Sequence, residues 1–160
     1  MINIIAAVAD NNIIGNQNQL PWTLKEDMAR FKSLTIGNIV VMGKNTYNSI
    51  SHPLKDRTNV IISSTMHDID GAIVVPNFDI AIQKAKEIAQ KENKQIFICG
   101  GQCVYQSAIH TADTLYITHV HQKPEGDAYF PKIPDDFVKI ESTHLIDTGT
   151  NTDFCIYKRR

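Results

Sequence analysis

The sequence predicts an α/β fold: a three-layer sandwich in which helices cover both faces of a mostly parallel sheet. Two observations support this. Apolar runs too short for helices recur along the chain, and several are apolar on both faces, as strands covered on each side are. Between the runs lie segments whose apolar residues recur at helical spacing. The expected strands are Ile2–Ala9, Ile39–Met42, Val60–Ile62, Ala72–Val75, Ile96–Cys99 and Leu115–Val120.

Four helices are expected between these strands. In the first, Thr23 and Glu26 have the spacing of a capping box, and the helix is expected to end near Leu34. The other three are expected over residues 44–50, from the capping residue Asn77 to about 92–94, and from near Gly101 through Val104, Tyr105, Ala108 and Ile109.

The end of the chain has a different pattern. Two strand-like stretches, 137–143 and 154–158, are joined through the turn-forming residues 147–151. They predict an antiparallel hairpin at one side of the sheet. No repeat, linker or low-complexity tract interrupts the 160 residues, so we expect a single domain over 1–160.

Composition narrows the class of partner. Sixteen Lys and Arg against seventeen Asp and Glu leave a net charge of -1. Without a basic footprint, a small molecule is a better candidate than nucleic acid. The apolar run Ile2–Ala9 is too short to cross a bilayer, so no membrane partner is expected. Three cysteines, Cys99, Cys103 and Cys155, do not form a disulfide framework; reduced thiols in the cytoplasm are the simplest interpretation.

One carboxylate stands on the apolar face of the first helix. On a helical wheel, Leu24, Met28, Phe31 and Leu34 share an arc of about 120°. Asp27 falls between Phe31 and Leu34 rather than among the charged residues. Its side chain is therefore expected to point inward.

Two interpretations of Asp27 are open at this point. The wheel alone favours a structural role, in which the positive end of the helix dipole, or a backbone or hydroxyl donor, offsets the burial of the charge. In the functional interpretation, the carboxylate lies in a cleft and waits for a ligand with two adjacent N–H donors, because its two oxygens accept such a pair well.

Three connecting segments are candidates for ligand contact. Residues 14–22 could form a lid, although an ordinary connection with Trp22 as a core anchor explains them as well. Gly43-Lys44-Asn45-Thr46 follows a strand and opens a helix, so it could hold a phosphate, but the spacing is not that of a Walker A loop. Gly100-Gly101 lies in a similar place and fits either a pyrophosphate contact or a tight turn.

A metal site is not expected. His119 and His121 face the same way on a strand, and Cys99 and Cys103 flank a strand-to-helix turn. Neither pair has companion ligands at metal spacing, so packing or surface roles are preferred.

Taken in order, these features resemble bacterial dihydrofolate reductases over essentially the whole chain. The matching residues are Ile14-Gly15, Leu20-Pro21-Trp22, Asp27, Phe31, Val41 to Thr46, Ser49-Ile50, Pro53-Leu54, Arg57, Ile61 to Ser64, Gly100-Gly101, Val104-Tyr105, Leu115 to His119, Glu125-Gly126-Asp127 and Phe130-Pro131.

The resemblance implies an eight-stranded sheet with adjoining clefts for NADPH and dihydrofolate. Hydride would pass from the nicotinamide to C6 of the pterin, and N5 would receive a proton, giving tetrahydrofolate for one-carbon metabolism. Asp27 would bind the N3 and 2-amino edge of the pterin together with Thr118. A water near Leu20 and Trp22 would deliver the proton, and Tyr105 would lie beside the nicotinamide. Antifolate inhibitors would bind the same cleft, and the enzyme would be a cytoplasmic monomer.

The resemblance also assigns binding residues. Substrate contacts would come from Ile5, Asp27, Met28, Phe31, Lys32, Ile50, His52, Leu54, Arg57, Cys99 and Thr118, with Arg57 on the α-carboxylate of the glutamate tail. Cofactor contacts would come from Ala7, Ile14, Gly15, Asn18, Leu20, Gly43, Lys44, Asn45, Thr46, Ser63, Ser64, Gly100, Gly101, Gln102, Cys103, Val104 and Tyr105. A cis peptide is implied between Gly100 and Gly101.

Three departures from the family pattern stand out. Many bacterial relatives carry Arg at the position of Cys103 and a basic residue at that of Pro76, both near the adenosine 2'-phosphate. Here neither is basic, so a preference for NADPH would depend on Lys44 and Ser64. The segment 90–95 is longer than usual and is expected to be an extended helix end.

Two other functions compete with this assignment. A reductase of the same fold that acts on a pyrimidine precursor would not need an inward carboxylate on the first helix. A non-catalytic nucleotide-binding module would keep the glycine turns at 43 and 100–101 but would need no Asp27, Arg57 or Thr118. Asp27 therefore separates the folate enzyme from both.

Overall fold

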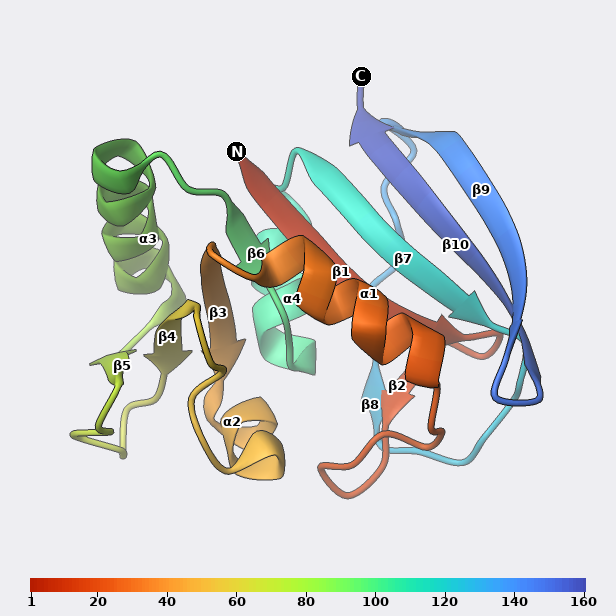
Figure 1. Ribbon diagram of the computed structural model, residues 1–160, viewed down its shortest axis with the longest axis horizontal. Helices are drawn as coiled ribbons and strands as arrows, with labels where there is room; N and C mark the ends of the chain where they lie inside the picture. Colours follow the sequence, from red (N-terminus) through yellow and green to blue (C-terminus); the bar gives the residue numbers. More distant parts are fainter.

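The strands of the computed structural model, which describes residues 1–160, form a twisted central sheet with helices on either side (Figure 1). In chain order the strands are β1 (Ile2–Ala9), β2 (Ile13–Gly15), β3 (Ile39–Gly43), β4 (Thr58–Ile62), β5 (Ala72–Val75), β6 (Ile96–Ile98), β7 (Thr114–Val120), β8 (Ala128–Tyr129), β9 (Phe137–Asp147) and β10 (Thr150–Arg159). The helices are α1 (Lys25–Thr35), α2 (Lys44–Ile50), α3 (Phe78–Glu92) and α4 (Gln102–Ala108).

The main sheet has eight strands in the order β5-β4-β3-β6-β1-β7-β10-β9. The first six of these pair in parallel, whereas β10 pairs antiparallel with both β7 and β9. The predicted fold class, with four helices and an antiparallel hairpin at one side of the sheet, is therefore confirmed. Every strand expected from an apolar run is present.

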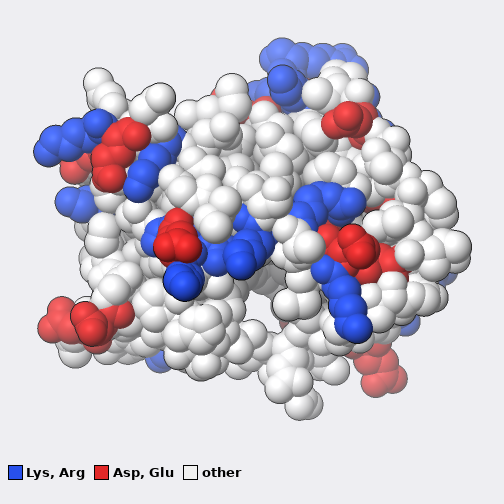
Figure 2. All heavy atoms as spheres, in the orientation of Figure 1, with Lys and Arg blue, Asp and Glu red and all other residues white.

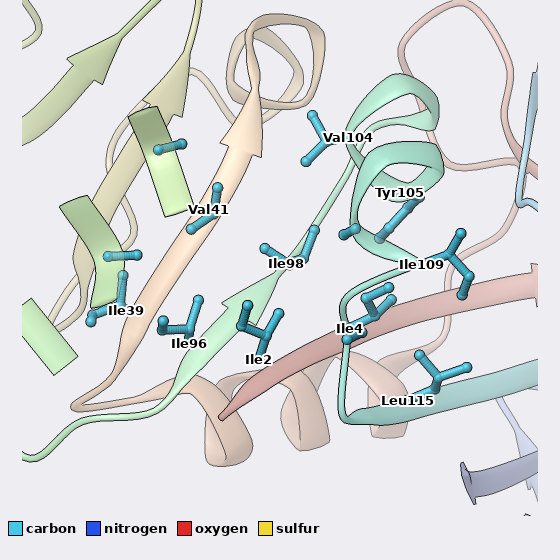
Figure 3. Packing of buried hydrophobic residues seen from close by; sticks show 14 of the residues in the cluster. Ile2, Ile4, Ile39, Val41, Ile96, Ile98, Val104, Tyr105, Ile109 and Leu115 are labelled. Carbon is cyan, nitrogen blue, oxygen red and sulfur yellow. The ribbon is translucent and has the colours of Figure 1, made fainter. Parts of the chain in front are cut away.

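Alternating side chains of the strands supply two cores, one on each face of the sheet. In β3, Ile39 and Val41 pack with α3 and α4, and Val40 and Met42 pack on the opposite face with residues of α1 and α2. Figure 3 shows the first core, in which apolar side chains of β1, β3 and β6 lie beside Val104 and Tyr105 of α4. Burial on both faces explains why the strands read as continuous apolar runs.

The third helix follows its sequence signals closely. The side chain of Asn77 accepts a hydrogen bond from the backbone N–H of Ile80, which caps α3 as predicted. The helix extends to Glu92 and ends on Asn93 in the left-handed conformation. The long segment 90–95 is thus an extended helix end, as expected.

The predicted capping box of the first helix is wrong. Leu24 occupies the N-cap position of α1, and no side chain of that segment caps the helix. Instead, Asp147 and Thr148, at the far end of the sequence, accept hydrogen bonds from its first backbone N–H groups. A partner so distant in sequence leaves no local spacing to detect.

Two further differences concern the loops. β2 and β8 form a small second sheet that sequence patterning did not predict, since three-residue and two-residue strands show no periodicity. The turn between β9 and β10 is tighter than residues 147–151, because Thr148 and Gly149 alone turn the chain, both at positive φ. No helix of the chain has the length and apolar character needed to span a membrane.

Candidate active site

The candidate site lies at the carboxyl ends of the central parallel strands, where α/β sheets bind ligands. The strands β3, β6 and β1 end here, and the segments that follow them lead to α2, to α4 and, through β2, to α1. Figure 2 shows that the surface is hollowed between α2 and the segment that joins β2 to α1. We call this hollow the cleft.

Asp27 is held on the inner side of α1. Its Oδ1 accepts a hydrogen bond of 2.5 Å from Oγ1 of Thr118 on β7, a residue that is only 3% exposed. Nη1 of Arg30, one turn later, lies 3.5 Å from the same oxygen, and the Asp27 side chain remains 22% exposed. The predicted inward direction is therefore observed.

Burial raises the pKa of Asp27 above its ordinary value. The hydrogen bond from Thr118 and the charge of Arg30 lower it by less than burial raises it. A carboxylate that is partly dehydrated yet reachable from solvent can bind a ligand with N–H donors, and it holds a proton more readily than an exposed one does.

Below Asp27 the cleft has an apolar wall. Phe31 of α1, Ile50 of α2, Leu54 and Cys99 pack around the buried cluster that contains Ile5. Burial raises the pKa of the Cys99 thiol to about 12, so the thiol is neutral and serves as part of this wall. The structure thus brings together five of the residues assigned to substrate.

Two apolar side chains near the cleft are exposed. Met28 was placed on the buried arc of α1, yet it is 61% exposed. Leu20, in the segment between β2 and α1, is 60% exposed. Leu24 lies on the same arc as Met28, yet it is buried and packs with Trp22. Wheel positions alone do not distinguish a side chain that the core covers from one that remains exposed.

The polar residues assigned to the distal part of the substrate lie on α1, which carries Lys32, and on the segment between α2 and β4, which carries His52 and Arg57. Arg57 donates from Nε to the Lys55 carbonyl and from Nη1 to Oγ1 of Thr35, which fixes the direction of its guanidinium. Lys32 is exposed, and His52, also exposed, contacts the Pro53 carbonyl through Nδ1. Part of the Arg57 fork remains available for an anion.

On the other side of the cleft, the two glycine turns meet. The backbone N–H of Gly43 donates to the Gly100 carbonyl, and the Gly100–Gly101 peptide is cis, as the family resemblance implied. A Cβ on Gly100 would come within 2.9 Å of Oγ1 of Thr46, and one on Gly43 within 3.2 Å of Val104. The glycines keep the starts of α2 and α4 in close contact.

Lys44 extends from this turn toward the end of β4. Its Nζ donates to Oγ1 of Thr65, next to the exposed Ser64. The hydroxyl of Ser63 accepts from the backbone N–H groups of Thr65 and Met66, so this serine organises the turn. A hollow beside it is lined by Ser63, Ser64, Met66, His67, Asp68, Val74, Val75 and Pro76. At the adjoining helix starts, Asn45 and Cys103 are exposed, whereas Gln102 is half-buried.

Tyr105 lies in the floor between the two sides of the cleft. Its hydroxyl donates to the Ile5 carbonyl over 2.8 Å, and its ring packs against Phe130. Burial raises the pKa of Tyr105 well above its ordinary value, so the side chain is an uncharged donor. Ala7 lies beside Thr118 in the pairing of β1 with β7.

The segment 14–22 contains the core anchor considered for it. Trp22 is buried against Ile13 and Leu24, which makes it a core anchor. Between Gly15 and Leu20, Gln17 and Asn18 have positive φ, and the backbone N–H of Gln17 contacts both carboxylate oxygens of Asp127. The segment is therefore anchored at Trp22 and tethered at Gln17, with an exposed stretch between.

Sequence reasoning missed two charged residues near Asp27. Arg30 looked like an ordinary exposed residue on the wheel, and Asp147 was assigned to a turn. A helical wheel compares residues within one helix, so it could not place Asp147, which lies on another element. No cluster of His, Cys, Asp and Glu side chains in the chain has a geometry that could hold a metal ion.

Comparison with known proteins identifies the family. The dihydrofolate reductase family model matches residues 1–159. The chain belongs to the dihydrofolate reductase family. It is 38% identical to dihydrofolate reductase type 3 of Salmonella typhimurium over 132 residues, which are 82% of this chain and 78% of that protein. It is 34% identical to the Bacillus subtilis enzyme over 144 residues, which cover 89% and 83% of the two chains.

A solved dihydrofolate reductase shares the fold. The enzyme of Enterococcus faecalis, complexed with NADP(H) and RAB-propyl, superposes with a TM-score of 0.87 at 28% identity, and the match covers 100% of this chain and 96% of that one. The predicted family is thus confirmed. The matches favour a dihydrofolate reductase over the two competing functions, a pyrimidine-precursor reductase and a non-catalytic module.

Proposed function

We propose that this chain reduces 7,8-dihydrofolate to tetrahydrofolate with NADPH, through a cleft in which Asp27 binds the pterin. Family membership supports the reaction, and a dihydrofolate reductase of the same fold is complexed with NADP(H). The observation that carries the proposal is the partly buried carboxylate of Asp27, which the Thr118 hydroxyl holds at the cleft. A nucleotide-binding module would have no use for it.

In this proposal, Asp27 binds two adjacent N–H donors of the pterin, at N3 and the 2-amino group, as carboxylates do in bidentate pairs. Thr118 holds one carboxylate oxygen, and the negative charge favours the protonated pterin. A hydride, with its electron pair, passes from the nicotinamide to C6, and a proton reaches N5 through water near Leu20 and Trp22. The products are tetrahydrofolate and NADP⁺. Asp27 thus polarises the substrate without touching N5.

The cofactor side of the cleft fits a dinucleotide. Gly43, Gly100 and Gly101 keep side chains away from the helix starts, where backbone N–H groups bind phosphates. Bound there, NADPH would supply the hydride. We assign the phosphates to Lys44, Asn45, Thr46, Gly101, Gln102 and Ser64, with Ser63 organising the turn. The nicotinamide is assigned to Ala7, Ile14, Gly15, Asn18, Leu20 and Tyr105.

Discrimination between NADPH and NADH is assigned to Lys44 and Ser64. The hollow next to these residues has Pro76 on its wall and no Lys or Arg among its lining residues. Because Lys44 already reaches Thr65, its charge is available at the mouth of that hollow for a 2'-phosphate.

The remaining substrate contacts follow from the apolar wall. Phe31, Ile50 and Leu54, with the exposed Met28, are proposed to enclose the p-aminobenzoyl group. The fork of Arg57 is proposed to bind the α-carboxylate of the glutamate tail, with Lys32 and His52 nearby. Antifolates that present the same N–H edge would compete for Asp27. We also propose that the enzyme is a cytoplasmic monomer. Its net charge of -1 favours the absence of nucleic-acid partners.

The test is the loss of NADPH absorbance on adding dihydrofolate to the purified chain. Wild type should turn over, and Asp27→Asn should lower kcat/KM at neutral pH by about 10²–10⁴-fold, the range for a positioned acid or base. Glu26→Gln is the matched control, since it removes a charge from an exposed side chain in the same helical turn. No turnover by wild type would refute the reaction, and full activity of Asp27→Asn would refute the role of Asp27.

A further inference from the structure

The first turn of α1 is capped from the other end of the chain. Backbone N–H groups of Glu26 and Asp27 donate to Oδ1 and Oδ2 of Asp147, over 3.0 and 2.9 Å. The Lys25 N–H donates to Oγ1 of Thr148, whose hydroxyl in turn donates to Oδ1 of Asp147. Figure 1 shows the tip of the β9–β10 hairpin beside the start of α1.

This cap replaces a local one. Leu24 at the N-cap position has no acceptor in its side chain, and no side chain of its own segment serves the helix start. Asp147 is only 1% exposed, so both of its oxygens are committed to the helix rather than to water. Burial works to raise the pKa of Asp147, but the hydrogen bonds from Glu26, Asp27 and Thr148 lower it by more, and the carboxylate is ionised at neutral pH.

The hairpin tip is itself fixed. The side chain of Gln122 donates to Oγ1 of Thr150, and the backbone N–H of His121 donates to the Asn151 carbonyl. The two residues that follow β7 therefore hold the tip of the hairpin. β7 also carries Thr118, the donor to Asp27. One rigid strand therefore holds the Asp27 side chain directly and its backbone through the hairpin.

We propose that Asp147 is a positioning residue for Asp27: its carboxylate fixes the backbone N–H of Asp27 and places a second negative charge behind the substrate-binding carboxylate. The inference rests on the proposed function, in which Asp27 binds the pterin. Asp147 is only 1% exposed and its carboxylate contacts the start of α1 and Thr148, so in this proposal it acts through α1 rather than on a ligand.

Two charged residues near Asp27 shift its pKa in opposite directions. Arg30 lowers its pKa from one side, and Asp147 raises it from the other. Tyr105 in the cleft floor and Cys99 in the apolar wall are neutral, because burial raises the pKa of both side chains. Lys25 and Glu26 are exposed to solvent. Removing Asp147 should therefore make Asp27 a weaker base, and removing Arg30 should make it a stronger one.

The experiment compares Asp147→Asn with wild type in single-turnover hydride transfer over a range of pH. In the proposed function, the rate should fall at high pH as the pair of Asp27 and bound pterin loses its proton. For Asp147→Asn this fall should move to lower pH by about half a unit, as expected for one charge acting through a partly hydrated region. KM for dihydrofolate should rise about threefold to tenfold, and KM for NADPH should not change.

Three further variants serve as a control and as independent tests of the Asp147 proposal. Asp136→Asn removes a charge just before β9, at the opposite end of that strand from Asp147, and should leave the pH profile unchanged. Arg30→Gln should move the profile to higher pH. Thr148→Val keeps the Asp147 charge but removes its donor, so it should raise KM for dihydrofolate without moving the profile, which keeps a test available if Asp147→Asn fails to fold.

The outcomes separate the two proposals. An Asp147→Asn profile that superposes on wild type, or an unchanged KM for dihydrofolate in both Asp147→Asn and Thr148→Val, overturns the role of Asp147. A lower melting temperature with an unchanged profile also overturns it, because it marks a purely structural cap. The proposed function fails by different results, which the Asp147 variants do not affect: no turnover by wild type refutes the reaction, and full activity of Asp27→Asn refutes the role of Asp27.

Discussion

Replacing Thr118 by Val removes the one hydroxyl that donates to Asp27. Thr118 is 3% exposed, its Oγ1 lies 2.5 Å from Oδ1 of Asp27, and valine fits a strand as well as threonine does. A hydrogen bond to a charged group contributes about 1.5–3 kcal/mol. At about 1.36 kcal/mol per unit, the pKa of Asp27 should rise by about 1–2 units. If half of that energy is used in binding, dihydrofolate should bind about threefold to tenfold more weakly.

The same substitution predicts how stability depends on pH. Because Thr118 stabilises the ionised form, its contribution is present when Asp27 is ionised and is lost as the pH falls through the folded pKa, which lies above 3.8. Near pH 7 the melting temperature of Thr118→Val should therefore be lower by about 3–12 °C, from about 2–4 °C per kcal/mol. Near pH 4 the difference from wild type should be much smaller.

Thr114→Val is the matched control for this prediction. Thr114 lies on the same strand, is 2% exposed, and its hydroxyl contacts only the sulfur of Met1. Circular dichroism melts at several pH values and steady-state kinetics give both readouts. If Thr118→Val destabilises the protein equally at pH 7 and pH 4, or leaves KM for dihydrofolate unchanged, the hydrogen bond does not stabilise the Asp27 carboxylate.

Three shorter predictions follow. Lys44→Ala should lower the ratio of kcat/KM for NADPH to that for NADH, and an unchanged ratio would refute its contact with the 2'-phosphate. Phe97→Ala, in a fully packed core position, should reduce the unfolding free energy in urea by about 3–5 kcal/mol. Hydrogen bonds to Asp153 and Asp10 raise the pKa of His121, so its contribution is present below pH 6.5 and lost as pH rises through the folded value. His121→Gln should thus lower the melting temperature more at pH 6 than at pH 8.5.

The sheet was predictable from the sequence because its strands are buried on both faces. Ile39, Val40, Val41 and Met42 face alternate cores, so every residue of β3 is apolar. Helix signals worked where they are local, as with Asn77 at the start of α3. The short strands β2 and β8 were not predictable, because pairing between segments more than 100 residues apart forms them without any periodic pattern.

Some features of the candidate site were also predictable from the sequence, and others were not. The direction of Asp27 followed from its place on the wheel, since burial depends on the helix face that carries it. The wheel also placed Met28 inward, yet it is 61% exposed, because a wheel ranks directions around one helix and does not show where neighbouring elements cover that helix. The donor Thr118 entered through the family resemblance alone. Asp147 could not have been found, since nothing near Asp27 in the sequence indicates a partner 120 residues away.

The helix that carries Asp27 depends on contacts with residues that are distant in the sequence. α1 has 11 residues, which is too short to be stable alone in water, and it lacks a cap of its own. Its apolar residues and its buried carboxylate require the sheet, and its first N–H groups require the β9–β10 hairpin. The hairpin residue Asp147 lies 120 residues beyond Asp27 in the sequence. The position of Asp27 therefore depends on contacts between segments that are distant along the chain, namely α1, β7 and the β9–β10 hairpin.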